Sequence, residues 1–258
     1  MDKLRLNSLD PIELPNWRWD PFLVQTVNAF SLLTKKPYPI AEQFLDRSVN
    51  LGSNNKNIQA NSSIWAFTAE KIRQARAACV DAGKIASVLN FVVSPSYSYD
   101  LPFLGADFVT LPGGHLVALD LQPVLKNDAK HTEEVWDRLI PLHKHWQSFF
   151  PSAGGIPEEA KPFFSPGLLW TKIPFSDESD ELINKVLKDA YQDYLELYID
   201  LISRANLVPV QRSSELRKGQ LNYMRYRSDK DPARGMLSRI FGKEWTESYI
   251  HSVLFNMD

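Results

Sequence analysis

Hydrophobic residues follow helical spacing near the start of the chain. Between residues 20 and 30 they fall on one helical face, at Phe22, Leu23, Val27 and Phe30. Asp20 and Pro21 fit the N-cap and the first helical position of this element. The proline-containing segment 35–39 is expected to end it, and the polar segment 46–61 predicts a loop.

The middle of the chain changes to strand periodicity. Apolar or alternating runs bounded by turn residues indicate β-strands in segments 63–67, 86–93, 103–111 and 115–121. Segment 72–80 is ambiguous, because its Ala and Arg residues favour helix. Since the turn 81–84 joins it to a clear strand, we predict a strand there too. With the turn at Pro112-Gly-Gly114, the pattern predicts an antiparallel meander of about five or six strands.

The second half of the chain is mostly helical. Apolar stripes at helical spacing indicate helices in segments 131–150, 180–205, 213–228 and 245–254. A stretch rich in Pro and Gly over 151–167 predicts a long loop. Strands in the middle with helices on both sides in the sequence predict an α/β fold, a three-layer α/β/α sandwich with a central antiparallel sheet. No internal repeat or linker is present, so residues 1–258 are expected to form a single domain.

Charge and composition narrow the classes of function. The chain has 258 residues, of which 44% are hydrophobic and 23% charged, a mix typical of globular proteins. A net charge of −2 argues against a general nucleic-acid binder. The apolar runs are too short to cross a bilayer. The start Met-Asp-Lys-Leu-Arg carries no targeting pattern, so we expect a cytoplasmic protein, or a mature organellar form such as one in a plastid stroma.

Cysteine usage and missing motifs limit the redox chemistry. Cys79 is the single cysteine, so no disulfide within the chain, Cys-ligated iron–sulfur cluster or Cys-type zinc site can form. No dinucleotide-binding, P-loop or nucleophile-elbow motif is present. His143 and His145 diverge on a helix, which disfavours a shared metal. If the protein handles electrons, they must come from outside. The aromatic content of 12% fits a well-packed core, and also a flat conjugated ligand among rings.

Two acidic residues interrupt apolar strands. Asp107 lies within the strand 103–110, on the opposite face from Phe108. Because a carboxylate is costly to bury, Asp107 either faces water or has a chemical role. Asp120 poses the same question in the next strand, where a solvent-facing position is the simpler interpretation.

A basic segment near the end of the chain holds a further candidate. Arg227 and Asp231 are four residues apart and can approach each other on a helical turn, which Pro232 ends. Basic residues outnumber acidic ones across segment 225–243. The segment fits either a solvated helix end or a site for an anion or acidic partner, with a carboxylate placed to donate a proton.

Several short motifs are notable for their order and spacing. They are Tyr99–Asp107 (YDLPFLGAD), Ala118–Pro123 (ALDLQP), Phe163–Gly167 (FFSPG), Tyr226–Gly235 (YRSDKDPARG), and Phe241–Trp245 (FGKEW) followed by His251–Phe255 (HSVLF). Each motif alone is weak, but together they resemble the ferredoxin-dependent bilin reductase family. The resemblance extends over almost the whole chain, from Trp17 to Phe255.

The resemblance implies a ligand and an electron donor as well as the sandwich fold. An open-chain tetrapyrrole would lie between the sheet and the C-terminal helices, and reduced ferredoxin would supply electrons singly, with no bound cofactor, metal or flavin. The family's central sheet aspartate falls on Asp107, and its C-terminal acid falls on Asp231, with Arg227 one turn before it. Members that form phycocyanobilin carry Glu where this chain has Ala78 and His where it has Asn90, so their four-electron chemistry is not expected here.

Within the family, the resemblance implies reduction of the A-ring diene of 15,16-dihydrobiliverdin to phycoerythrobilin. Asp107 and Asp231 would be the catalytic proton donors, Arg227 would orient Asp231 or a propionate, and Asn90 would hydrogen-bond a lactam carbonyl of the substrate. The alternatives are a phytochromobilin synthase, a reductase that forms 15,16-dihydrobiliverdin from biliverdin, and a non-catalytic bilin carrier.

The implied partners follow from this chemistry. Reduced ferredoxins are acidic, so we expect a basic docking surface. The candidate docking residues are Lys71, Arg73, Lys84, Arg234, Arg239 and Lys243. A direct handover of substrate would add the preceding, dihydrobiliverdin-forming reductase as a partner. We expect a monomer, with no nucleic acid or membrane among its partners.

Overall fold

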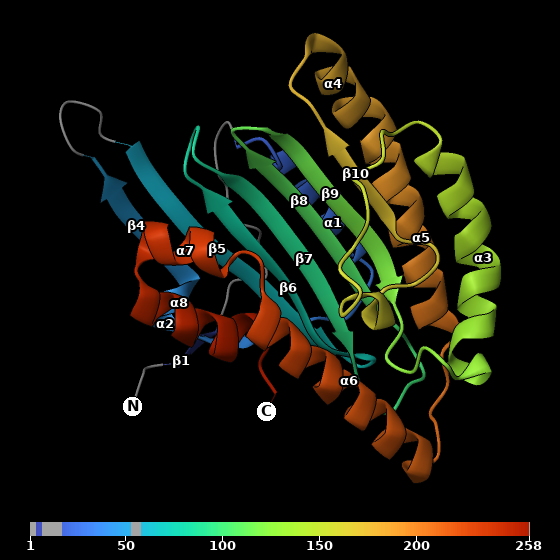
Figure 1. Cartoon of the computed structure of the whole chain (residues 1–258). Coiled ribbons are helices and arrows are strands. Elements are labelled where there is room, and N and C mark those ends of the chain that lie inside the picture. Colours follow the sequence, from blue (N-terminus) through green and yellow to red (C-terminus); the bar gives the residue numbers. More distant parts are fainter. Residues whose placement is uncertain (1–3, 7–16, 53–57, 258) are drawn as a thin grey trace.

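One antiparallel sheet organises the molecule (Figure 1). The structure is a computed structural model that describes residues 4–6, 17–52 and 58–257. Within these residues an 8-stranded sheet has the order β10-β9-β8-β7-β6-β5-β2, and β4 also pairs with β5. Its strands are β2 (Lys36–Pro37), β4 (Asp46–Leu51), β5 (Ile58–Ala69), β6 (Ile72–Asp81), β7 (Ser87–Pro95), β8 (Phe103–Leu111), β9 (Gly114–Gln122) and β10 (Leu169–Ile173). The short strands β1 (Leu4–Leu6) and β3 (Pro39–Ala41) pair separately.

Helices cover both faces of this sheet, which confirms the predicted three-layer α/β/α sandwich. One face packs against α1 (Asp20–Ala29), α3 (Ala129–Gln147) and α5 (Lys188–Arg204). The other packs against α2 (Glu42–Leu45), α6 (Val210–Lys230), α7 (Arg234–Phe241) and α8 (Lys243–Tyr249). The short helix α4 (Asp177–Glu181) continues through a π-helical segment, Leu182–Leu187, into α5. A 3-10 turn at Lys161–Phe163 and a π-helical segment at Ile250–Leu254 complete the set.

The N-terminal part of the chain differs from the sequence prediction at two places. The loop predicted over 46–61 is wrong for most of its length, because β4 pairs with the first half of β5. The side chains of β4 are exposed or half-buried, so polar residues suit this strand, and only Val49 and Leu51 mark its inner face. Residues 53–57 of that prediction lie outside the described residues. In the first helix, Trp19 takes the N-cap position and Asp20 is the first helical residue.

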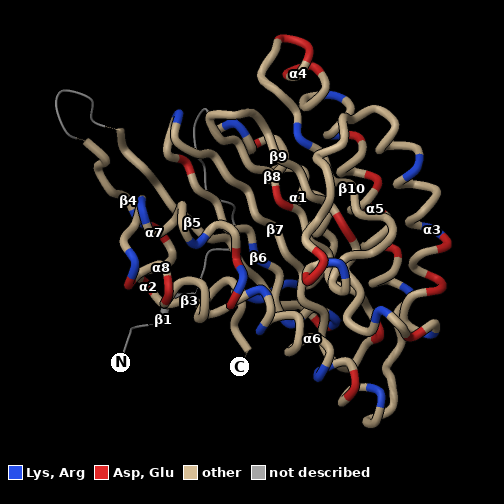
Figure 2. The backbone as a smooth tube through the Cα atoms, viewed as in Figure 1, with Lys and Arg blue, Asp and Glu red and all other residues tan. Residues whose placement is uncertain are grey.

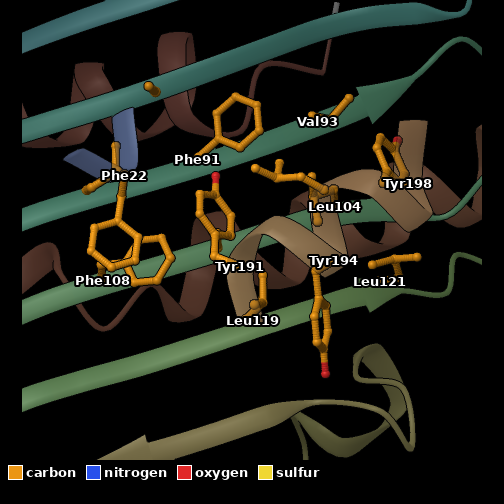
Figure 3. Packing of buried hydrophobic residues seen from close by; sticks show 14 of the residues in the cluster. Phe22, Phe91, Val93, Leu104, Phe108, Leu119, Leu121, Tyr191, Tyr194 and Tyr198 are labelled. Carbon is orange, nitrogen blue, oxygen red and sulfur yellow. The ribbon is translucent and has the colours of Figure 1, made fainter. Parts of the chain in front are cut away.

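The first face of the sheet forms a dry aromatic core. Figure 3 shows Tyr191 of α5 beside Phe22 of α1 and Phe108 of β8. The ring centroids of Phe22 and Phe108 are 4.7 Å apart, and those of Phe108 and Tyr191 are 5.0 Å apart. The Tyr191 hydroxyl forms a 2.6 Å hydrogen bond with the hydroxyl of Thr26, so the buried phenol is satisfied. This packing fixes the sheet from one side.

The opposite face is crossed by α6, whose position is set near its start by a charge network. Arg212 donates to the carboxylates of Asp100 and Asp128, with N–O distances of 2.6 Å and 2.5 Å. Asp100 also pairs with His131 Nδ1, and the backbone N–H of Val124 donates to His131 Nε2. The network ties the first turns of α6 to the connection between β9 and α3.

A glycine allows the middle of α6 to approach that same connection. A Cβ atom on Gly219 would clash with the carbonyl oxygen of Val124. Gly235 of α7 is a contrasting helical glycine, because a Cβ atom there would meet nothing within 4 Å. Gly219 therefore sets how closely α6 approaches the sheet.

We predict opposite effects of alanine at these two glycines. Gly219→Ala should lower the free energy of unfolding by roughly 1–3 kcal/mol, the usual cost of overpacking. Gly235→Ala should leave it unchanged or raise it by up to about 1 kcal/mol, because alanine is the better helix former. Urea unfolding of both variants measures the difference. Equal stability of the two variants would contradict the close approach of α6.

Candidate active site

A row of polar and small residues lies on the sheet face beneath α6. The strand register places Asn90 opposite Asp107, and Asp107 opposite Ala118. On the same strands, Gly105 lies opposite Asp120. Because side chains alternate across each strand, these residues share the face that the C-terminal helices cover.

A narrow cleft of about 10 Å³, room for about one water molecule, lies between this row and the helix. Strands β7, β8 and β9 form one side of it, and Tyr223 and Arg227 of α6 form the other. Phe164 and Leu168, from the segment before β10, line it as well. Three of the residues predicted from the sequence, Asn90, Asp107 and Arg227, therefore meet in one cleft.

Asp107 is held at the end of a hydrogen-bond chain that begins in the core. The amide nitrogen of Asn90 donates to Oδ1 of Asp107. Nη1 of Arg76 donates to the amide oxygen of Asn90 at 2.6 Å, and Nε of Arg76 donates to the carbonyl of Leu254 at 3.1 Å. Our sequence analysis missed Arg76. A charged residue inside the apolar strand 72–80, two positions from Ala78, was the available signal.

Asp231 lies just beyond the last residue of α6 and is buried. Burial raises its pKa above the ordinary value, and the opposing effect of Arg227 is weaker. The closest approach between the two is 3.8 Å, from Nη2 of Arg227 to Oδ2 of Asp231. The backbone N–H of Ala233 donates to the other carboxyl oxygen at 2.8 Å. Asp231 thus contacts Arg227 rather than lining the cleft itself.

Asp120 is buried, so the solvent-facing interpretation of this residue is wrong. Burial raises its pKa to about 7, although hydrogen bonds from Ser165 act in the opposite direction. The backbone N–H of Ser165 donates to Oδ2 at 2.8 Å, and its hydroxyl donates to Oδ1. Asp120 therefore fixes the segment that brings Phe164 to the cleft.

Lys126 and a ring pair hold the same segment. The ammonium group of Lys126 donates to the carbonyls of Lys161 and Phe164, at 2.5 Å and 2.7 Å. The ring of Phe163 stacks on Tyr226 of α6, with centroids 4.4 Å apart and planes inclined by 21°. The segment is joined in this way to both the sheet and the helix at the border of the cleft.

Two of the six candidate docking residues have structural partners. Lys71 donates to the carbonyls of Ile202, Ser203 and Ala205 at the end of α5. Arg234 pairs with Glu247 and donates to the carbonyl of Ser228. Arg73 is half-buried beside the ring of Tyr97. The side chains of Lys84, Arg239 and Lys243 are exposed.

The part of the chain that the structure describes holds neither a metal-ligand cluster nor a membrane-spanning helix. No group of three or more His, Cys, Asp and Glu residues is placed there to hold a metal ion. No helix in this part is both long and apolar enough to span a bilayer. Cys79 is fully buried, and burial raises the pKa of its thiol.

The chain belongs to the ferredoxin-dependent bilin reductase family, whose family model matches residues 24–256. It is therefore a ferredoxin-dependent bilin oxidoreductase, and ferredoxin is its electron donor.

Individual relatives are similar over their full length. The chain is 55% identical over 257 residues to a phycoerythrobilin:ferredoxin oxidoreductase of Prochlorococcus marinus (strain MIT 9211), covering 100% of both chains. It is 56% identical to the protein of the same name from Synechococcus sp. (strain RCC307), covering 98% of this chain and 97% of the relative. The crystal structure of tomato phytochromobilin synthase in complex with biliverdin is similar with a TM-score of 0.80 and 26% identity, over 92% of this chain and 82% of that one.

We predict that Asp120 makes stability depend on pH. Its pKa is about 7 in the folded protein and 3.8 as the ordinary value, so the folded state holds a proton that the unfolded state has lost. Stability should fall as pH rises between these two values, with a slope of roughly 1 kcal/mol per pH unit. Asp120→Asn should flatten this fall, whereas the exposed Asp189→Asn should not. Urea unfolding at several pH values measures the slopes, and equal slopes in all three proteins would contradict the assignment.

Proposed function

We propose that this chain reduces the A-ring diene of 15,16-dihydrobiliverdin to phycoerythrobilin. The relatives that are 55% and 56% identical carry the corresponding name, and the similarity extends over the full chain. The observation that carries the proposal is the arrangement of two acids around the cleft. Asp107 lies on the sheet side, and Asp231 lies behind Arg227, which lines the α6 side.

The proposed reaction adds two electrons and two protons to the bilin. Two reduced ferredoxins each deliver one electron, and Asp107 and Asp231 each deliver one proton. Two C–H bonds form at the ends of the diene, and the remaining double bond moves between them. Water then returns a proton to each carboxylate, so the enzyme ends in its starting state. Protonation by a positioned acid favours electron uptake, because the reduced bilin does not accumulate negative charge.

The two acids have different tasks in this proposal. Asp107 protonates the bilin near its pyrrole nitrogens or lactam, and this proton moves on to one end of the diene as the electrons are taken up, which completes the second C–H bond. Asn90 hydrogen-bonds a lactam carbonyl. Asp231 delivers a proton on the A-ring side, where Arg227 orients Asp231 or a propionate. The raised pKa of Asp231 supports this task, because a proton stays available at higher pH than for an ordinary carboxyl group.

Two neighbouring positions restrict the reaction to a single reduction. Ala78 and Asn90 lie opposite each other on β6 and β7, on the face that α6 covers. Neither side chain can donate an acidic proton. A second reduction at the D ring would require such a donor, so we propose that the reaction ends after two electrons.

A second candidate is a phytochromobilin synthase, which applies the same A-ring chemistry to biliverdin. The similarity to the solved tomato enzyme with biliverdin favours it. Anaerobic assays with dihydrobiliverdin and with biliverdin, side by side, separate the two by the absorption spectra of their products. A methine-bridge reductase would convert biliverdin to dihydrobiliverdin, and a bilin carrier would bind without turnover.

We predict that Asp107→Asn and Asp231→Asn each lower kcat by about 10²–10⁴-fold, the usual contribution of a general acid. The variants keep side-chain size and remove only the transferable proton. Single-turnover assays with reduced ferredoxin measure the rate, and absorption spectra detect a trapped bilin radical. The exposed Asp189→Asn serves as control. Wild-type rates in both acid variants would refute the assignment.

Ferredoxin is proposed to dock on the outer face of α6. Nine Lys and Arg residues stand against five Asp and Glu residues in segment 210–249, whereas segment 177–204 holds eight acidic and three basic residues. Figure 2 displays this contrast between α6 and the acidic α4 and α5. Arg217, Lys218 and Arg225 are exposed on α6, and Arg217 shares the Tyr97 ring with Arg73. Since Arg227 lines the cleft from the same helix, an acidic donor there is one helix diameter, about 10 Å, from the bilin.

Charge reversal on α6 is predicted to weaken ferredoxin docking. The double variant Arg217→Glu/Arg225→Glu should raise the KM for ferredoxin about tenfold at low salt, with a smaller difference at high salt. Lys188→Glu makes the same kind of change on α5 and serves as control. Steady-state assays at two ionic strengths measure the effect. An unchanged KM, or an equal effect of Lys188→Glu, would contradict the α6 surface.

A further inference from the structure

Arg76 is a buried charge that the proposed reaction does not use. It lies in the middle of β6, on the face covered by the C-terminal helices, and its exposed fraction is 1%. One of its terminal nitrogens, Nη2, is buried without a hydrogen-bond partner among the described residues. Within the described part of the chain, no carboxylate hydrogen-bonds Arg76 directly, and its connection to Asp107 runs through Asn90. An apolar side chain would fill this position at lower cost, so a functional role accounts for the charge better than stability does.

The chemistry of Arg76 fixes the direction of the hydrogen-bond chain. A guanidinium group only donates hydrogen bonds, so the amide oxygen of Asn90 must face Arg76. The amide NH₂ of Asn90 is then turned toward Asp107 and must donate to it. Asn90 alone would have no reason to choose this orientation, because its oxygen and nitrogen have nearly the same shape.

The chain in turn constrains the carboxyl group of Asp107. Its Oδ1 atom accepts from Asn90, and in a protonated carboxyl group the carbonyl oxygen accepts hydrogen bonds better than the hydroxyl oxygen. A proton held by Asp107 is therefore on Oδ2. In effect, the geometry selects one of the two carboxyl oxygens for proton exchange.

We propose that Arg76 is a positioning residue that locks the amide of Asn90, so that Asp107 exchanges protons with the substrate through Oδ2 alone. The inference rests on the proposed function, because it assigns a task to a residue behind the proposed proton donor. Arg76 also holds the carbonyl of Leu254, and a purely structural role through that contact is the competing explanation.

Two substitutions at position 76 separate these roles. Lysine only donates, so Arg76→Lys keeps the charge and the direction of the chain. Glutamine both donates and accepts, so Arg76→Gln lets the Asn90 amide turn over. We expect Arg76→Gln to lower kcat roughly tenfold or more, the rate equivalent of one hydrogen bond to a charged group, with little change in the KM for bilin. Arg76→Lys should retain more of the wild-type kcat.

The absorption spectrum of bound bilin gives a readout without turnover. Its pH dependence should shift in Arg76→Gln and stay closer to the wild type in Arg76→Lys. Asn90→Asp adds a variant that leaves Arg76 and its Leu254 contact in place while replacing the donor to Asp107 with an acceptor. It should shift the same spectral titration, which keeps the proposal testable if Arg76→Gln fails to fold.

A double-variant cycle completes the test. In an Asn90→Ala background, Arg76→Gln should have no further effect on kcat or on the spectral titration, because Arg76 acts through Asn90. Independent, multiplicative effects of the two substitutions on kcat would overturn the proposal. An equal loss of kcat in Arg76→Lys and Arg76→Gln would also overturn it, because it would indicate that Arg76 acts through its contact with Leu254. Failure of the wild type to convert dihydrobiliverdin would instead refute the proposed function and leave the spectral comparison valid.

Discussion

A charged group that is withdrawn from water must find its partners within the protein, and this constraint organises the space between the sheet and α6. Two guanidinium groups, Arg76 and Arg227, share that space with the carboxyl groups of Asp107 and Asp231. Arg76 connects to Asp107 through Asn90, and Arg227 lies 3.8 Å from Asp231. Both guanidinium groups also lie against the ring of Phe255, at 5.8 Å and 5.4 Å. A ligand that carries charge therefore enters a space that already holds two guanidinium groups and two carboxyl groups.

The sheet separates this polar network from a dry core. On the face away from α6, buried tyrosines of α5 satisfy their hydroxyl groups locally: Tyr194 donates to the carbonyl of Gly167 at 2.8 Å, and Tyr198 donates to the carbonyl of Pro102 at 3.0 Å. Aromatic packing there holds the strands in register. Because the backbone of β8 is fixed from behind, Asp107 can keep one position although its own face carries polar groups.

The sequence was informative where a pattern is local. Alternation in the strand 103–111 identified Asp107, and four-residue spacing paired Arg227 with Asp231, whereas the family motifs supplied their roles. Contacts between distant segments left no such pattern. No residue pattern near Lys71 predicts its hydrogen bonds to the end of α5, which begin 131 residues later in the chain. Asp120 shares a strand face with Ala118 and Gln122, but only the fold reveals that Ser165 covers it.

The two proposed proton donors differ in what holds them. Asp107 belongs to a strand flanked on both sides by other strands, so its position is set by the sheet. Asp231 follows the last turn of α6, so its position relative to Asp107 depends on how that helix lies on the sheet. The close contact at Gly219 and the Arg212 network govern this placement. If ferredoxin binds the outer face of α6, the helix that carries the electron donor also positions Asp231, and docking is coupled to the geometry of proton delivery.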